Sequence, residues 1–136
     1  MSTASIAKTL GFPTRARDLI DVTRAGLPAK IADRLAELGG LTPEQLAAAL
    51  GVSTRTLARQ RARARLGAVE SDRAVRLARV LGLVHDVFEN RKTAIGWLHD
   101  PIVALGGKAP VEFLDTDAGV RRLEQILTRL DYGGIS

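Results

Sequence analysis

Two short helix-forming segments joined by a glycine turn constrain the fold of this chain more than any other feature. The first, in "LTPEQLAAALG", begins at Thr42, with Pro43 at the first helical position and Gln45 placed for a capping box. Gly51 begins the turn, and Ser53 caps the second segment, "STRTLARQRARA". Two short capped helices at this spacing predict a helix-turn-helix.

The composition of the whole chain favours helices. Hydrophobic residues make up 46% of the 136 residues and aromatic residues only 4%. A chain of this length buries roughly two-thirds of its unfolded surface, which is enough for a core without disulfides. We therefore expect an all-α protein, with the helix-turn-helix in an N-terminal helical unit and a smaller helical unit after it.

Apolar spacing and capping residues predict the other helices of the N-terminal unit. We expect helices over about residues 14–24 and 28–38, and a third that begins at a Ser71 cap and ends before Gly82. The inward-facing residues of the second helix are Leu27, Ile31, Leu35 and Leu38.

The C-terminal third continues in helices that proline and asparagine interrupt. We expect a break near Asn90, a helix end at Pro101, a loop after it, and a short helical turn opened by Pro110. Thr116 or Asp115 caps a last helix. The apolar stripe of that helix is Val120, Leu123, Ile126, Leu127 and Leu130.

The positive charge is concentrated in the centre of the chain. The net charge is +5, yet residues 53–84 alone carry eight arginines and two acidic residues, a net charge of +6. Residues 85–136 carry a net charge of −2. This asymmetry predicts two surfaces with different partners.

The arginine-rich second helix of the motif points its basic side outward. With Leu57 as the inward direction, Arg61 and Arg65 lie nearer the core, where we expect intramolecular or dimer contacts. The second helix of a helix-turn-helix enters the major groove of DNA, so Arg55 and Arg59 are expected to read bases. The predicted DNA-contacting residues are Ser53, Thr54, Arg55, Arg59 and Arg63. The alternative is a solvated basic surface on a motif that serves dimerisation.

The residues that most enzymes and metal sites require are absent or isolated. The chain has no cysteine, which excludes disulfides and thiolate chemistry and indicates a reducing compartment. His85 and His99 lack a companion nucleophile or third ligand, so we expect both at the surface. We predict no enzyme activity, no metal and no cofactor. The chain lacks a signal peptide and a run of membrane-spanning length, so a cytoplasmic location is expected.

Two long stretches resemble one family. "LTPEQLAAALGVSTRTLARQRARARLGAVESDRAVRLARVLGL" resembles the helix-turn-helix part of the Xre/MbcA/ParS-like antitoxins, and "AIGWLHDPIVALGGKAPVEFLDTDAGVRRLEQILTRLDYG" is similar to their C-terminal toxin-binding domain. The resemblance runs from about Gly26 to Gly134. It implies a type II toxin-antitoxin role: a RES-domain toxin that consumes or transfers from NAD as partner, steric cover of its active site, and repression of the shared operon.

The resemblance also implies a toxin-binding site along the C-terminal pattern. Its residues are Trp97, Leu98, Pro101, Leu105, Gly106, Gly107, Pro110, Leu114, Asp115, Thr116, Tyr132, Gly133 and Gly134. Trp97 is the single tryptophan and is either an interface anchor or a core residue. Gly106 and Gly107 are also expected in a turn that requires positive φ. The segment after Leu130 is expected to be a flexible tail that either reaches into a partner's cleft or frays.

These expectations divide the chain into three parts. Residues 1–26 form an N-terminal extension, residues 27–84 a helix-turn-helix unit for DNA binding and dimerisation, and residues 85–136 a helical toxin-binding unit with a C-terminal tail. A homodimer is expected because two-fold operators match two-fold proteins. The rival functions are a stand-alone helix-turn-helix transcriptional regulator and a nonspecific nucleoid-associated protein.

Overall fold

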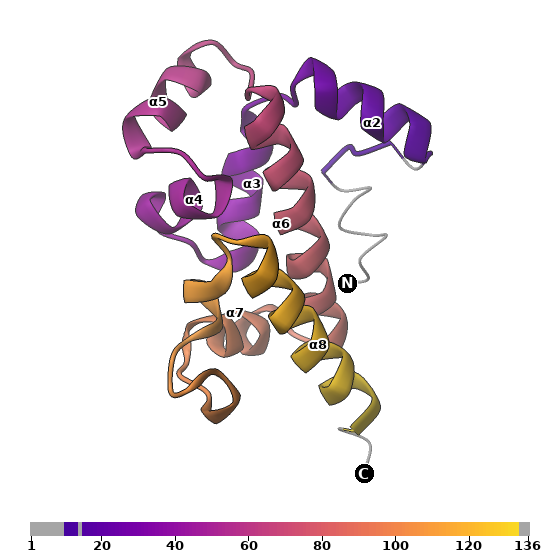
Figure 1. Ribbon diagram of the computed structural model, residues 1–136, viewed down its shortest axis with the longest axis vertical. Helices are drawn as coiled ribbons and strands as arrows, with labels where there is room; N and C mark the ends of the chain where they lie inside the picture. The colour runs from indigo at the N-terminus through magenta and orange to yellow at the C-terminus, as the bar shows by residue number, and fades with distance from the viewer. Residues whose placement is uncertain (1–9, 14, 134–136) are drawn as a thin grey trace.

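Helices make up all the regular elements of the part of the chain that the computed structural model describes, residues 10–13 and 15–133 (Figure 1). This confirms the all-α prediction. In chain order the elements are α2 (Ala16–Ala25), α3 (Lys30–Gly39), α4 (Pro43–Leu50), α5 (Thr54–Ala62), α6 (Ala68–Val87), α7 (Arg91–His99), the 3-10 turns η1 (Val103–Leu105) and η2 (Pro110–Phe113), and α8 (Asp117–Gly133).

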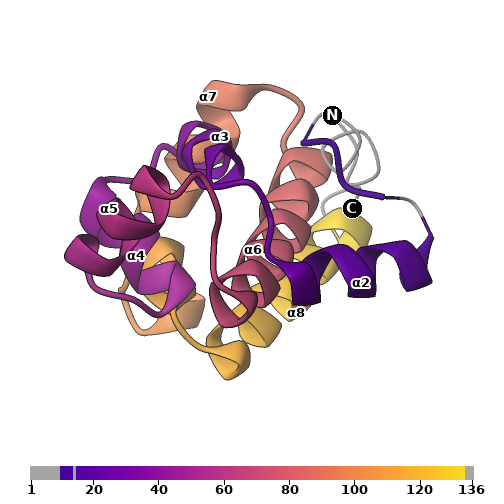
Figure 2. The same cartoon turned by 90° about the horizontal axis from the view of Figure 1, so that it is seen from above.

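Helix α6 is the centre of the molecule. The other helices lie around it (Figures 1 and 2), and its fully buried side chains include Leu77 and Leu81. Helices α2, α3 and α4 contact α6 from the N-terminal part of the chain, and α7 and α8 contact it from the C-terminal part. Both parts therefore share one hydrophobic core.

The predicted ends of the helix-turn-helix are confirmed. The Thr42 N–H donates to Gln45 Oε1 (3.0 Å) and the Gln45 N–H donates to Thr42 Oγ1 (3.1 Å), which completes the capping box at the start of α4. Gly51 ends α4 in the left-handed conformation, and Ser53 Oγ accepts from the Thr56 N–H (3.0 Å) at the start of α5. Local hydrogen bonds thus set both helix boundaries.

The predicted helix starts in the C-terminal third are confirmed as well. Asn90 Oδ1 accepts from the Thr93 N–H (2.8 Å) at the start of α7, and Thr116 Oγ1 accepts from the Gly119 N–H (2.9 Å) at the start of α8. The apolar stripe of α8 is buried except at its last member, Leu130. These caps confirm the break near Asn90 and leave Thr116 as the residue that caps α8.

The prediction for the central helix is wrong at both of its ends. Helix α6 begins three residues before Ser71, and Ser71 is buried inside it, with its Oγ accepting from the Leu27 N–H (2.8 Å). Gly82 does not end the helix, because it is buried in the core and packing there outweighs the weak helix propensity of glycine. Helix α6 continues to Val87, so the proposed division of the chain at residues 84–85 lies within it.

The two histidines are not surface residues as predicted. His85 is buried and its Nε2–H donates to the Leu38 carbonyl (2.9 Å), while the partly buried His99 donates to the Gly39 carbonyl (2.9 Å). Both rings lie at the C-terminal end of α3, where backbone carbonyls lack partners within the helix. This long-range capping gives both histidines a structural role.

No helix in the described ranges is both long enough and apolar enough to cross a membrane.

Candidate functional site

Helix α5 and the residue after it present a row of exposed polar and basic side chains. The residues predicted at DNA are all exposed: Ser53, Thr54, Arg55, Arg59 and Arg63. Arg63 lies at the C-cap, just beyond the last helical residue. In the described part of the chain none of these three arginines pairs with a carboxylate, and Arg59 Nη2 donates to Thr56 Oγ1 (3.3 Å). Such a surface can contact phosphates and base edges.

The other two arginines of this stretch bind within the chain, as predicted. Arg61 forms an ion pair with Asp33 of α3, with 2.6 Å between Nη2 and Oδ1. Arg65 Nη1 donates to the Gly26 carbonyl (2.8 Å) and to the Ala25 carbonyl (3.3 Å), at the end of α2. These bonds stabilise the position of the segment that follows α5.

A glutamine that the sequence analysis did not single out attaches α5 to α6. Gln60 is buried, its Nε2 donates to Glu70 Oε1 (2.8 Å), and its Oε1 accepts from the Gly67 N–H (3.1 Å). Gln60 lies three residues after Leu57 and therefore on the same side of the helix, and that spacing is the signal that could have found it. Gln60 positions the exposed arginines relative to the core.

The connection between α5 and α6 is fixed to the segment before α3. The Leu66 N–H donates to the Leu27 carbonyl (2.9 Å), and the Ala29 N–H donates to the Ala64 carbonyl (3.2 Å). Ala64 has a φ of 59°, in the left-handed region that a residue with a side chain rarely adopts. The C-terminal end of α5 is therefore held by tertiary contacts.

Four of the residues expected at a toxin are core residues. Leu98, Leu105, Pro110 and Leu114 are all buried. Trp97 is half-buried, packs on the core, and lies against Phe88 with 5.6 Å between ring centroids. The Trp-Leu and Leu-Gly-Gly parts of the C-terminal pattern therefore shape this unit from inside.

The other predicted toxin-contacting residues lie mostly at the surface. Pro101, Gly106, Gly107, Asp115 and Thr116 are exposed. Gly106 and Gly107 have φ values of 68° and 81°, which confirms the turn with positive φ.

The end of the chain differs from the expected flexible tail. Helix α8 continues beyond Leu130 to Gly133, so Tyr132 and Gly133 belong to the helix. Gly134 lies outside the described residues.

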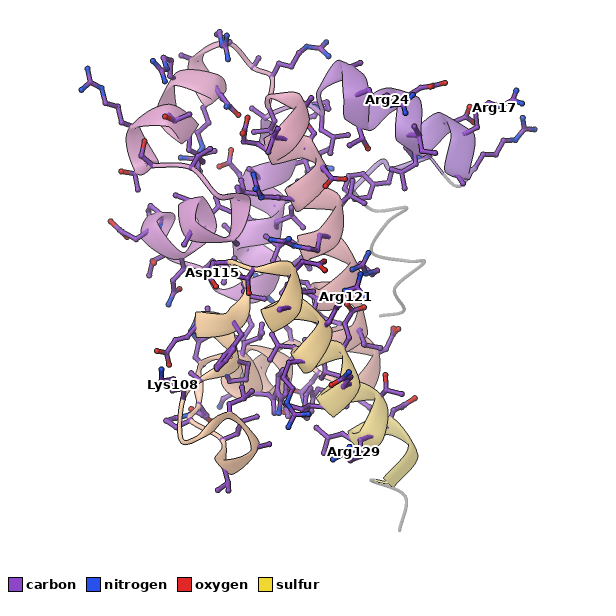
Figure 3. The ribbon with its side chains drawn as sticks, in the orientation of Figure 1. Arg17, Arg24, Lys108, Asp115, Arg121 and Arg129 are labelled. Carbon is purple, nitrogen blue, oxygen red and sulfur yellow. The ribbon has the colours of Figure 1, made fainter. Side chains whose placement is uncertain are left out.

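The basic surface and the loop after η1 lie at different ends of the long axis, whereas Asp115 lies between them (Figure 3). Figure 3 shows Lys108, in the loop after η1, at the end away from α5, and Arg24 of α2 at the end where α5 lies. Within the described ranges no group of three or more histidine, cysteine, aspartate or glutamate residues could hold a metal ion. The arrangement has the features of two binding surfaces on one molecule.

Two family models match consecutive parts of the chain. Residues 18–79 match the model of the antitoxin Xre-like helix-turn-helix domain. Residues 83–133 match the model of the antitoxin Xre/MbcA/ParS C-terminal toxin-binding domain.

Three curated proteins are similar over most of their length. The chain is 28% identical to an "Antitoxin Xre" of Yersinia enterocolitica, over 98% of this chain and 93% of that protein. It is 27% identical to an "Antitoxin Xre" of Photorhabdus laumondii, over 95% and 89%. It is 26% identical to the "Prs ADP-ribosylating antitoxin" of a Sphingobium species, over 88% and 81%.

Proposed function

Because the chain belongs to the Xre/MbcA/ParS antitoxin family, we propose that it neutralises a RES-domain toxin encoded beside it. The chain is an antitoxin of a toxin-antitoxin system, and its partners are a toxin and DNA. The observation that carries the proposal is the match of residues 83–133 to a toxin-binding domain. The choice of a RES-domain toxin rests on the resemblance of the C-terminal pattern. The name of the Sphingobium relative supports it, since ADP-ribosylation takes its ADP-ribose from NAD.

Neutralisation is proposed to be steric. The unit after residue 84 docks on the toxin and denies NAD access to the active site. The exposed members of the predicted site, such as Pro101, Asp115 and Thr116, are the proposed contacts, whereas the buried leucines hold these contacts in position. Such a mechanism needs no chemistry from the antitoxin, so we propose a binding protein that is not an enzyme and that acts in the cytoplasm.

The helix-turn-helix is proposed to repress the operon that encodes both proteins. The support is the exposed basic side of α5. Arg55 and Arg59 are the proposed base-reading residues, and Arg63, just beyond α5, is a further proposed DNA contact. A homodimer would place two such helices on the two halves of an operator. The division at residue 84 is proposed for function only, because both parts pack on α6.

Coexpression with the adjacent gene tests the toxin proposal. We expect the antitoxin to copurify with a RES-domain protein, to restore growth, and to keep cellular NAD at its normal level. If the copurified protein does not lower cellular NAD when it is expressed without the antitoxin, the RES assignment is contradicted. Absence of a complex would instead support a stand-alone transcriptional regulator.

Binding to the promoter fragment of the operon in rising salt tests the DNA proposal. We expect sequence preference to persist at physiological salt, because base contacts add to the salt-dependent phosphate contacts. Equal affinity for unrelated DNA would favour the nonspecific nucleoid-associated alternative.

A further inference from the structure

A short loop, residues 102–108, projects from the C-terminal unit and contains η1. An isolated β-bridge closes it, with the Ile102 N–H donating to the Lys108 carbonyl (3.1 Å) and the Gly107 N–H donating to the Ile102 carbonyl (3.0 Å). Gly106 and Gly107 turn the chain in the left-handed region. These backbone bonds stabilise the conformation of the loop in the free chain.

The loop sends one apolar side chain inward and another outward. Leu105 is buried against the core, with 8% of its surface exposed. Val103, two residues earlier, is 95% exposed. In the described part of this unit the other exposed large hydrophobic residue is Leu130, at 39%. Val103 is therefore the most exposed large apolar side chain among the described residues of this unit.

The side chain of Val103 contributes almost nothing to the stability of the free chain. Hydrophobic stabilisation is proportional to the apolar area removed from water, and a side chain that is 95% exposed removes almost none. Single exposed apolar residues are common on protein surfaces. Here, however, the residue is β-branched, has few rotamers and lies on a loop that is already ordered, so burying it against a partner costs little conformational entropy.

We propose that Val103 is an apolar anchor of this antitoxin on its toxin and fills a small apolar pocket on the toxin surface. The inference rests on the proposed function. It adds to the toxin-binding surface a residue that the predicted site did not include. Two observations select the toxin as the occupant. Val103 lies within residues 83–133, which match a toxin-binding domain. Its loop, marked by Lys108 in Figure 3, lies at the end of the molecule away from the DNA-reading helix α5.

Binding of the full-length antitoxin to the purified product of the adjacent toxin gene tests this proposal. We expect Val103→Asp to raise the Kd at least about tenfold, because a carboxylate would enter an apolar pocket, and Val103→Ala to raise it about threefold. The matched control is Val69→Asp, which changes another exposed valine (56%) at the start of α6, outside the matched toxin-binding range. Its Kd should stay within twofold of the unchanged protein.

Three results distinguish the possible failures. If Val103→Asp binds within twofold of the unchanged antitoxin, the anchor proposal is wrong while the proposed function stands. If Val69→Asp weakens binding as much as Val103→Asp, the effect is one of charge and the anchor is again wrong. If the unchanged antitoxin does not bind the toxin, the proposed function fails and the anchor with it. Thermal unfolding of the three variants checks that all of them are folded to the same extent.

Discussion

Ser71 stabilises the junction between the segment before α3 and the central helix through one buried hydroxyl group. Its Oγ accepts from the Leu27 N–H (2.8 Å), and neither residue is exposed to solvent. A buried backbone N–H without an acceptor is costly, because it loses its bond to water on folding. At the residue scale this serine therefore acts as a tertiary hydrogen-bond acceptor and not as a helix cap.

Replacing this serine should destabilise the protein. We expect Ser71→Ala to lower the free energy of unfolding by about 1–3 kcal/mol, because the Leu27 N–H stays buried and loses its acceptor. Urea unfolding of the full chain measures the change. Asp72→Ala, at the exposed neighbouring position, is the control and should change the free energy by less than about 0.5 kcal/mol. Equal effects of the two variants would contradict the role given to Ser71.

At Ala64 a substitution is expected to stabilise the protein, in contrast to Ser71. Its φ of 59° strains a residue with a Cβ, so Ala64→Gly should raise the free energy of unfolding by up to about 1 kcal/mol. The matched control is Ala62→Gly in the last turn of α5, which should lower it by about 0.5–1 kcal/mol. Denaturant midpoints of the two variants must therefore shift in opposite directions, and a parallel decrease would show that Ala64 carries no strain.

At the element scale, the two sides of α5 have different tasks. Buried Leu57 and Gln60 attach the helix to the core, and Arg61 pairs with Asp33 of α3. The exposed side carries the arginines without carboxylate partners in the described chain. Because a helix turns by 100° per residue, residues only two apart in sequence, such as Arg59 and Arg61, reach different surroundings.

This division predicts unequal effects of arginine variants on DNA binding. Arg55→Ala and Arg59→Ala should each weaken binding to the promoter fragment by about 1–3 kcal/mol, because each removes a proposed base contact. Arg61→Ala removes the same charge from a side chain that is already paired with Asp33, so the loss of DNA-binding affinity should be smaller. Titrations at several salt concentrations measure these affinities. An equal loss for Arg61→Ala would mean that total charge, and not the exposed side of α5, controls binding.

At the scale of the whole molecule, side chains of the C-terminal part complete a helix of the N-terminal part. Arg91 donates to the Glu37 carbonyl (2.7 Å), and His85 and His99 donate to the next two carbonyls of α3. Helix α6 also serves both parts, since α3 and α8 pack on it. A unit that begins at residue 85 would lack most of the helix on which it folds.

We therefore expect the chain to unfold in one cooperative transition. Far-UV circular dichroism follows all helices, and fluorescence follows Trp97, the single tryptophan, in the C-terminal part. The two signals should give the same urea midpoint, because the shared core leaves no part that is stable alone. Two separate midpoints would contradict this expectation. A fragment of residues 85–136 should show little helical signal. A stably helical fragment would also contradict the expectation of one cooperative transition.

Much of the fold could be predicted from the sequence, but less of the candidate sites. The caps at Thr42 and Ser53, the helix break near Asn90, the glycine turn and the outward arginines of α5 were predicted correctly. The predictions for Ser71 and His85 were wrong and the exposure of Val103 was not predicted, because each depends on contacts with segments distant in the sequence or on their absence. Homodimerisation and the individual toxin contacts stay predictions.

The sequence by itself determined the local features of this protein: where helices begin, where the chain turns, and which side of α5 is basic. These features depend on hydrogen bonds and dihedral preferences within three or four residues, so the residue order contains them directly. Only the tertiary structure decided which apolar residues of the C-terminal pattern are buried and which, such as Val103, are exposed. The burial of a side chain depends on the residues that pack against it, and in the core of this chain those residues come from other helices.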